Sequence, residues 1–350
     1  MRVAVILTHP APYREPVVSE LKRRFGSALN VYSLFGEDFG HSDLGLGTEN
    51  KPLIASKTQN LHGWDALAIS CRLVAKLGLF SRFDFVIWPA YAPWWLTIPI
   101  LIRSLLGRKF AVCLDTTHDA GSWFSKKIKE YIFRKARFLW IPGEASRRYL
   151  QTDYSVSDDK IVKGLYLPAF SIGKVAHSNH DKPVFLMVAN NLPNRKMHVL
   201  ATGFKRYLNK GGDGRLILCG KRASDFAGEG IDAIEGIPWP KLPDLYARAD
   251  VYVHTGNEQY STALLMGAMI GLPLMASRDV GATVDLFEDG SEDESGLLVD
   301  DWCSADAWEN GFEQMVGKRV QWPLMGEIAR KRAAKFDVVA TTAKVITFIA

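Results

Sequence analysis

Short apolar runs alternate with longer amphipathic stretches along the whole chain of 350 residues, and this alternation restricts the fold more than any other feature. Runs such as Val3–Leu7 and Val184–Ala189 are apolar throughout, which is typical of parallel strands covered on both faces. Stretches such as Glu15–Phe25 and His198–Asn209 instead carry apolar residues at helical spacing. Strands and helices in alternation predict an α/β fold with parallel sheets joined by right-handed crossovers.

One segment, Pro168–Pro183, has no clear periodicity and divides the chain into halves of similar size. We therefore predict an N-terminal doubly wound domain over residues 1–168, a linker over 169–183 and a C-terminal doubly wound domain over 184–350. The last helix is a candidate for packing back on the N-terminal domain. Because open α/β sheets bind ligands at the carboxyl ends of their strands, two facing sheets would form a cleft that holds the functional site.

The composition excludes several classes of protein. Hydrophobic residues make up 47% and charged residues 23% of the chain, which is a globular and not a disordered composition. The net charge of +5 fits an anionic small molecule or an anionic membrane surface as well as nucleic acid. No nucleic-acid-binding motif is present, so we expect no nucleic-acid partner.

The cysteines and the apolar stretches indicate the compartment. Three of the four cysteines lie in apolar runs and none forms a CxxC pair, so we expect buried free thiols and neither a disulfide framework nor a metal site. This pattern is typical of a reducing compartment. The longest apolar stretch, Tyr91–Leu106, is interrupted by two prolines and an arginine and is too short to span a bilayer. We therefore expect a cytoplasmic protein.

The segment from Tyr246 to Gly281 is the most informative for function. The predicted strand Val251–His254 leads through a polar turn into an apolar helix. Ser261 and Thr262 stand at the start of this helix, where free N–H groups and the helix dipole favour a diphosphate. Glu258 lies in the turn and is expected to face the cleft. An acidic residue here would also suit a simple helix cap.

The same segment carries a family resemblance. It reads LYARADVYVHTGNEQYSTALLMGAMIGLPLMAS and resembles the donor-site segment of glycosyltransferase family 4, a retaining family with the GT-B fold of two facing Rossmann-like domains and an interdomain cleft. Glu258 matches the first Glu of the family's motif, and Gly271-Leu272-Pro273 matches its closing motif. The resemblance implies that Glu258 lies near the transferred sugar. The family's second Glu, which binds the ribose hydroxyls, is replaced here by Met266.

A second stretch, which follows the strand at Phe185–Ala189, also resembles the family. The family has an Arg just after this strand and a Lys before the next helix, and both contact the donor diphosphate. Asn190 or Asn191 takes the place of the Arg, while Arg195 and Lys196 both stand near the Lys. The donor-binding residues implied by the resemblance are Asn190, Arg195, Lys196, Ser261 and Thr262.

A cation at this place would stabilise the departing diphosphate electrostatically. No Asp-x-Asp pair is placed to hold Mg²⁺, so we expect no metal and no cofactor. The alternative interpretation of the two adjacent cations is solvated charge before a helix.

The N-terminal half supplies further candidates. Thr117-His118-Asp119 follows a predicted strand, and in similar proteins a His at this place lines the sugar side of the cleft. The opening segment resembles the family's first strand and loop, with Tyr13 and Arg14 facing the cleft. The resemblance thus implies a catalytic His118 and acceptor-side residues Tyr13, Arg14 and Asp119. A structural His at a strand end is an open alternative.

A basic cluster follows two aromatic residues, Trp123 and Phe124, in the N-terminal half. One interpretation is an ordinary solvated helix face. The other is docking on an anionic bilayer that carries a lipid-linked acceptor, with the protein peripheral at the inner face of the membrane. The members of this cluster are Lys126, Lys127, Lys129, Arg134, Lys135 and Arg137.

Together with these features, the resemblance implies a metal-independent, retaining, hexosyltransferase-like glycosyltransferase of cell-surface polysaccharide biosynthesis. Its donor is expected to be a nucleotide-diphosphate sugar and its acceptor a glycan or a lipid-linked molecule, with Glu258 and His118 as catalytic residues. Two alternatives remain open: a catalytically silent GT-B-like protein that binds a glycan or a partner, and a nucleotide-sugar 2-epimerase. A nicotinamide oxidoreductase is disfavoured, because no Gly-x-Gly-x-x-Gly follows the first strand.

Overall fold

The computed structural model describes residues 1–8, 11–35, 63–79, 82–91, 93–118, 122–168, 180–190, 192–287 and 294–350. These residues form two compact units. The first contains the described residues of the N-terminal half together with Phe336–Ala350, and the second contains those of Phe170–Lys335. Most of the predicted linker, residues 169–179, lies outside the described residues.

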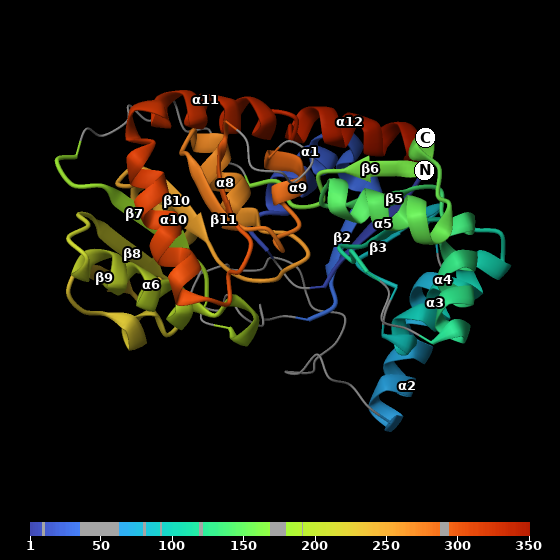
Figure 1. Ribbon diagram of the computed structural model, residues 1–350. Coiled ribbons are helices and arrows are strands. Elements are labelled where there is room, and N and C mark those ends of the chain that lie inside the picture. The colour runs from blue at the N-terminus through green and yellow to red at the C-terminus, as the bar shows by residue number, and fades with distance from the viewer. Residues whose placement is uncertain are drawn as a thin grey trace. The chain divides into compact units, whose positions relative to one another are not determined.

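The first unit is built on a parallel sheet of six strands in the order β2-β1-β3-β4-β5-β6 (Figure 1). The strands are β1 (Val3–Leu7), β2 (Leu29–Ser33), β3 (Phe85–Trp88), β4 (Lys109–Cys113), β5 (Leu139–Ile141) and β6 (Ile161–Lys163). The helices are α1 (Glu15–Phe25), α2 (Gly63–Leu73, continued by a π-helical segment to Leu79), α3 (Trp94–Leu105), α4 (Trp123–Lys135), α5 (Glu144–Tyr154) and α12 (Val338–Ile349). The last helix, α12, packs on α1 and β6.

The second unit repeats this architecture with the order β12-β11-β10-β7-β8-β9, again all parallel. Its strands are β7 (Val184–Val188), β8 (Arg215–Cys219), β9 (Ile231–Ile234), β10 (Val251–His254), β11 (Leu274–Ser277) and β12 (Gly296–Val299). Its helices are α6 (Met197–Asn209), α7 (Leu242–Tyr246), α8 (Thr262–Ile270), α9 (Thr283–Leu286), α10 (Ala305–Gly317) and α11 (Trp322–Ala333). The predicted α/β fold with two parallel sheets is confirmed.

The strand order of the second unit reverses between β7 and β10. The chain runs outward from β7 through β8 to β9, and then returns to place β10 on the other side of β7. Open parallel sheets bind ligands at such a switch point, because the loops that follow the two strands there diverge and leave space. The residues that follow β7 and β10 are therefore the best-placed ones in this unit for binding a ligand.

Each sheet is buried by its own helices. In the second unit the rings of Phe185, Phe204 and Phe312 pack edge-on with centroids 4.8 to 5.9 Å apart, which fixes α6 and α10 against β7. Of the cysteines, Cys113 and Cys219 are buried free thiols as predicted. The predicted burial does not extend to the rest, because Cys71 lies on the outer side of α2 and Cys303 in a loop, and both are exposed.

Candidate functional site

Two loops of the second unit form the candidate site. The loop after β7 passes through a short 3-10 helix, Pro193–Arg195, and α6 then begins at Met197. The loop after β10 ends at Ser261, whose side-chain oxygen accepts a hydrogen bond from the backbone N–H of Leu264 at 3.2 Å and so caps α8. Both loops therefore lead into a helix N-terminus, where N–H groups and the helix dipole favour an anion.

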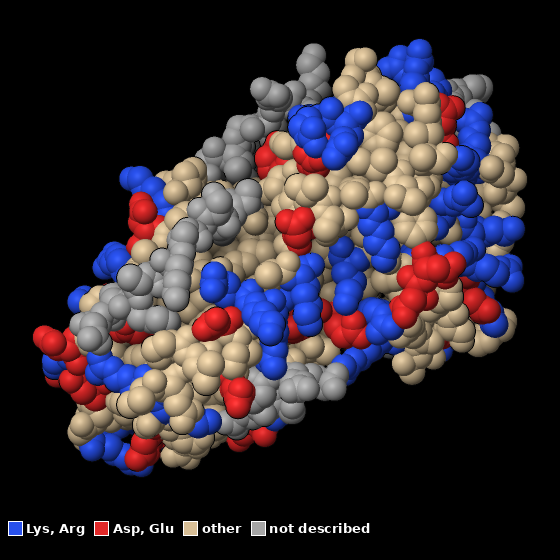
Figure 2. Space-filling model, turned by 90° about the horizontal axis from the view of Figure 1, so that it is seen from above, with Lys and Arg blue, Asp and Glu red and all other residues tan. Residues whose placement is uncertain are grey.

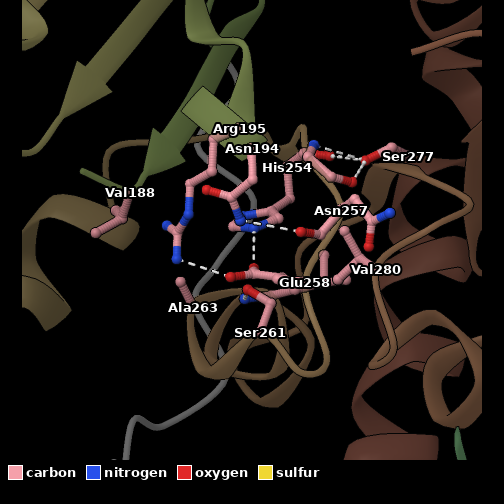
Figure 3. A network of polar contacts seen from close by, with 12 residues as sticks. Val188, Asn194, Arg195, His254, Asn257, Glu258, Ser261, Ala263, Ser277 and Val280 are labelled. Atoms are coloured by element: carbon pink, nitrogen blue, oxygen red, sulfur yellow. Dashed lines mark hydrogen bonds and ion pairs between the residues drawn. The ribbon is translucent and has the colours of Figure 1, made fainter. Parts of the chain in front are cut away.

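Backbone and side-chain hydrogen bonds join the two loops (Figure 3). The N–H of Asn257 donates to the carbonyl of Asn194 at 3.0 Å, and the Asn194 amide donates to the carbonyl of Asn257 at 2.9 Å. Gly256 has a φ of +134°, and a Cβ there would lie 3.0 Å from the Asn194 carbonyl, so glycine permits this approach. Ser277 completes the turn, since its hydroxyl accepts from the Gly256 N–H at 2.8 Å and donates to the Gly256 carbonyl at 2.7 Å.

The carboxylate of Glu258 lies where these loops meet. One oxygen, Oε2, accepts from Arg195 Nη2 at 2.7 Å, and the other, Oε1, contacts His254 Nε2 at 2.5 Å (Figure 3). The nearby Ser261 hydroxyl also favours the charged form of the carboxylate. The Glu258 side chain is 10% exposed and that of His254 is fully buried. The backbone is held too, because the Gly281 N–H donates to the Glu258 carbonyl at 2.9 Å.

The charges around Glu258 determine its ionisation. Burial by itself would raise the pKa of the carboxyl. The charges of His254 and Arg195, together with hydrogen bonds from His254 and Ser261, outweigh burial and lower the pKa of Glu258 to about 2. Glu258 is therefore an ionised hydrogen-bond acceptor at neutral pH, suited to bind hydroxyl groups or to stabilise positive charge.

Lys196 and Arg195 are adjacent in sequence, but they contact different partners. Lys196 has a left-handed φ of +42°, and its ammonium donates to Cys303 Sγ at 3.0 Å and lies 5.4 Å from the centroid of the Trp302 ring. The Trp302 indole N–H is itself held by Asp279 Oδ2 at 2.8 Å. Lys196 is thus placed beside the N-terminus of α6, whereas Arg195 is engaged by Glu258.

The remaining donor-side predictions fall in the same loops. Asn190 follows β7, and its Oδ1 accepts from the Lys221 N–H at 3.0 Å, which joins this loop to the one after β8. Thr262 is the first residue of α8. Asn191 lies outside the described residues. Met266, at the position of the family's second Glu, is 1% exposed within α8, so no carboxylate stands there.

In the first unit, Tyr13 and Arg14 lie between β1 and α1. The Arg14 guanidinium carbon is 5.2 Å from the centroid of the Tyr166 ring, and the Tyr13 ring packs edge-on against that ring at 5.2 Å. The Tyr166 hydroxyl donates to Asp115 Oδ2 at 2.9 Å. His118 is exposed in the loop after β4, and Asp119 lies outside the described residues.

Sequence reasoning did not identify several of these residues, among them Tyr166, Asp115 and His254, nor did it identify Tyr252, which precedes His254 on β10. Tyr166 and Asp115 are 51 positions apart, and no local pattern joins them. Tyr252 and His254 had a recoverable signal, since residues two apart on a strand share a face. His254 also stands four residues before Glu258.

Part of the chain matches the model of a known protein family. Residues 171–332 match the model of the protein family described as Glycosyl transferases group 1, and the predicted resemblance to glycosyltransferases is confirmed. The narrower assignment to family 4 stays a prediction. No curated protein sequence matches the chain closely enough to indicate a relative.

Solved glycosyltransferase structures share the fold along nearly the whole chain. A glycosyltransferase from Rickettsia africae is 14% identical, with a TM-score of 0.73 over 99% of this chain and 97% of that one. Anabaena HepE, in complex with UDP and glucose, is 14% identical, with a TM-score of 0.69 over 99% of both chains. WaaG, a glycosyltransferase involved in lipopolysaccharide biosynthesis, is 14% identical, with a TM-score of 0.65 over 99% of both chains. These likenesses confirm the predicted GT-B fold.

Proposed function

We propose that the protein is a retaining glycosyltransferase that moves a hexose from a nucleotide-diphosphate donor to a glycan or lipid-linked acceptor, without a metal ion. The family match and the GT-B fold support glycosyl transfer in general. One observation carries the more specific proposal. An ionised Glu258 and two cations, Arg195 and Lys196, lie at the β7–β10 switch point beside two helix N-termini.

Lys196 is the better candidate of the two cations for the donor diphosphate. Arg195 is held by the charged carboxylate of Glu258 at 2.7 Å, and such charge-assisted bonds are strong. The partners of Lys196 are a thiol and an aromatic ring, and a thiol is a weak acceptor that a phosphate oxygen readily replaces. We therefore assign the binding of the diphosphate to Lys196 and to the N–H groups near Ser261 and Thr262. Arg195 is assigned the role of holding the Glu258 carboxylate in place.

The proposed transfer follows from these roles. The acceptor hydroxyl attacks the anomeric carbon of the sugar from the face at which the diphosphate leaves. The bond from that carbon to the phosphate oxygen breaks while the new glycosidic bond forms, and the hydroxyl proton passes to the departing diphosphate. Lys196 stabilises the negative charge that develops on the leaving group. Glu258 accepts hydrogen bonds from the sugar hydroxyls and stabilises the positive charge that develops on the ring.

The acceptor side is proposed to lie in the first unit, with His118 as the residue that contacts the sugar and Tyr13, Arg14 and Asp119 as acceptor-side residues. The contacts of Arg14 and Tyr13 with the Tyr166 ring support this proposal. Aromatic rings beside a guanidinium group provide both an apolar face and hydrogen-bond donors for a sugar.

The surface charges favour a small anionic ligand over an extended one. On the face drawn in Figure 2, Asp and Glu side chains lie among the Lys and Arg side chains over much of the described surface. A nucleotide-diphosphate sugar needs only a local cation. UDP is the first nucleotide to test, because HepE has been solved with UDP and glucose.

We also propose that the protein works as a peripheral protein at the cytoplasmic face of a membrane, in cell-surface polysaccharide biosynthesis. Among the described residues, no helix is both long and apolar enough to cross a bilayer. Trp123 is 74% and Phe124 67% exposed at the start of α4, directly before the lysines of the basic cluster. Exposed aromatic residues beside lysines suit an anionic lipid surface, where a lipid-linked acceptor would be found. WaaG acts in lipopolysaccharide biosynthesis, which supports this setting.

The second candidate function is a catalytically silent protein that binds a glycan or a partner. The burial of Met266 at the position of the family's second Glu favours it, because a ligand for the ribose is then missing from that position.

Titration calorimetry with EDTA present separates the two functions. The purified protein is titrated with UDP, GDP and ADP and with UDP-glucose, GDP-mannose and ADP-glucose. We expect one nucleotide to bind, Lys196→Ala to weaken its binding, and Glu258→Ala to weaken the sugar conjugate more than the bare nucleotide. A folded protein that binds none of the six compounds would refute the donor site and favour the silent function.

A further inference from the structure

We infer that His254 is a positioning residue of the proposed transfer: its ring fixes the Glu258 carboxylate in one orientation, and Tyr252 fixes the ring. This inference rests on the proposed function, because it assigns to His254 a role that only a working Glu258 requires. It adds a residue that neither the family resemblance nor the comparisons with known proteins identify.

Both ring nitrogens of His254 have partners. His254 is the last residue of β10 and is fully buried. Its Nε2 contacts Glu258 Oε1 at 2.5 Å (Figure 3), and its Nδ1 lies 3.3 Å from the Tyr252 hydroxyl. The rings of Tyr252 and His254 are stacked, with their centroids 6.1 Å apart and an interplanar angle of 18°. The imidazole therefore has no freedom to rotate without losing a partner on one side.

The direction of the hydrogen bonds follows from the partners. A carboxylate only accepts, so the Nε2–H of His254 donates to Glu258. The Tyr252 hydroxyl lies between His254 and the backbone of Val188, where it donates to the carbonyl at 3.3 Å and accepts from the N–H at 3.4 Å. When the Tyr252 proton points to Val188, Nδ1 of His254 donates; when it points to His254, Nδ1 accepts. In both states Nε2 keeps its proton, so the contact with Glu258 persists in both.

The two anchors of Glu258 come from different elements. His254 on β10 holds Oε1, and Arg195 on the loop after β7 holds Oε2, so the plane of the carboxylate is defined by two directions. A carboxylate has about four acceptor positions. His254 and Arg195 use one on each oxygen, so each oxygen keeps acceptor capacity for a hydroxyl of the donor sugar. The network thus holds the acceptor atoms in one orientation before the sugar binds, as a site that orients a sugar requires.

The position of His254 on a strand makes this anchor rigid. β10 lies between β7 and β11 in the sheet, and its four residues are fully buried. Arg195, by contrast, belongs to a loop and has an exposed fraction of 18%. Loss of His254 would therefore leave Arg195, a loop side chain, as the remaining charged anchor of the Glu258 carboxylate, and the carboxylate could change its rotamer when the donor binds.

The kinetic test uses three variants and a matched control, with transfer and hydrolysis assayed on the donor that calorimetry identifies among UDP-glucose, GDP-mannose and ADP-glucose. A misplaced catalytic group costs on the order of 100-fold in rate, so we expect His254→Phe to lower kcat by roughly 10- to 100-fold while the affinity for the bare nucleotide is kept. His254→Gln should recover a large part of that loss, because its amide N–H can still donate to Glu258. Tyr252→Phe should have an intermediate effect.

The control is His180→Gln. His180 contacts the buried Asp250 through Nδ1 at 3.1 Å. These two residues precede β7 and β10, so their contact lies at the amino ends of these strands. It is a histidine–carboxylate contact of the same kind, away from the proposed chemistry. We expect this variant to lower stability without a change in kcat. A His254 effect that His180→Gln reproduces in full would show that the role of His254 is structural, and would overturn the inference.

A spectroscopic test does not depend on turnover. In protein labelled with ¹⁵N-histidine, we expect a ring N–H proton of His254 that is protected from solvent exchange and strongly shifted downfield, and we expect it to disappear in Glu258→Gln. Persistence of that resonance in Glu258→Gln would overturn the inference.

The proposed function and the proposed role of His254 would be refuted by different results. If the wild-type protein binds none of the donors, the proposed function fails and the positioning role fails with it. If the wild type transfers sugar, Glu258→Gln is impaired, and folded His254→Phe keeps the wild-type kcat and KM, only the inference about His254 is wrong.

Discussion

Replacing Glu258 with Gln removes the central charge of the candidate site, and the expected cost follows from its ionisation. The pKa of the carboxyl is lowered from 4.5 to about 2, with burial opposing the shift and the charges of His254 and Arg195 causing it. Each pKa unit is equivalent to about 1.4 kcal/mol, so the ionised state contributes roughly 3 kcal/mol to the free energy of unfolding at neutral pH. Because the side chain is only 10% exposed, solvent screening reduces this contribution little. Part of this cost arises because Glu258→Gln leaves Arg195 without its buried counter-charge.

The dependence on pH has a defined sign. The folded-state pKa of Glu258 is depressed, so the stabilisation is fully present above pH 4.5 and is lost as the pH falls toward about 2. The difference between wild type and Glu258→Gln should therefore be constant from pH 7 to pH 5 and should shrink at pH 4 and pH 3. Urea unfolding followed by circular dichroism at these values measures it.

The matched control is Glu130→Gln. Glu130 pairs with Lys127 at 2.9 Å on the surface of α4, and its side chain is 49% exposed. Exposed pairs of this kind contribute little to stability, so we expect no measurable change. The electrostatic reasoning about Glu258 would be refuted if Glu258→Gln and Glu130→Gln shifted the urea midpoint equally. It would also be refuted if the Glu258 difference did not shrink in acid.

Three further predictions test the ligand and the partner. Saturating UDP should slow the alkylation of exposed Cys303 by iodoacetamide and leave the exposed Cys71 unaffected, as mass spectrometry would show; equal rates with bound UDP would contradict the placement of the diphosphate. Because Met266 supplies no carboxylate for the ribose, UDP and 2′-deoxy-UDP should bind with equal affinity in calorimetry, and a strong preference for UDP would reveal another ribose ligand. Trp123→Ala should reduce co-sedimentation with vesicles that contain phosphatidylglycerol, whereas Leu105→Ala, at an equally exposed apolar position of the first unit, should not; equal losses would count against a specific lipid-binding surface.

Much of the fold could be predicted because local signals agree with tertiary packing. The periodicity predicts a helix at His198–Asn209, and the structure has α6 at Met197–Asn209; the strand Val251–His254 has the same bounds in both. Each segment carries the apolar pattern of its element, helical spacing in the first and a continuous buried run in the second. The apolar spacing also predicts a helix at Leu67–Leu79. In the structure this helix begins earlier, at Gly63, and changes to a π-helical segment after Leu73. No feature of the apolar pattern marks that change.

The parts of the site that could not be predicted depend on contacts between distant segments. The orientation of Glu258 toward His254 requires the turn at Gly256, and that turn is fixed by Ser277 on β11, 21 residues away. The sequence left open whether Arg195 or Lys196 takes the phosphate. Their different surroundings arise from the left-handed backbone of Lys196, which turns the two side chains to different partners. A backbone angle of this kind is set by the pairing of the two loops and leaves no signal in a single sequence.

The proposed donor site keeps a defined geometry even though Met266 stands at the position of the second Glu of glycosyltransferase family 4. Glu258 is already fixed from two directions by His254 and Arg195, and the loops that carry these groups are joined through Asn194 and Asn257. Little conformational entropy is then lost when a donor binds, because the groups that meet the sugar are ordered beforehand. Affinity that a ribose contact would otherwise supply can come from the diphosphate at Lys196 and from this preorganised carboxylate. On this reasoning, a change in the donor sugar should alter donor affinity more than a change in the ribose.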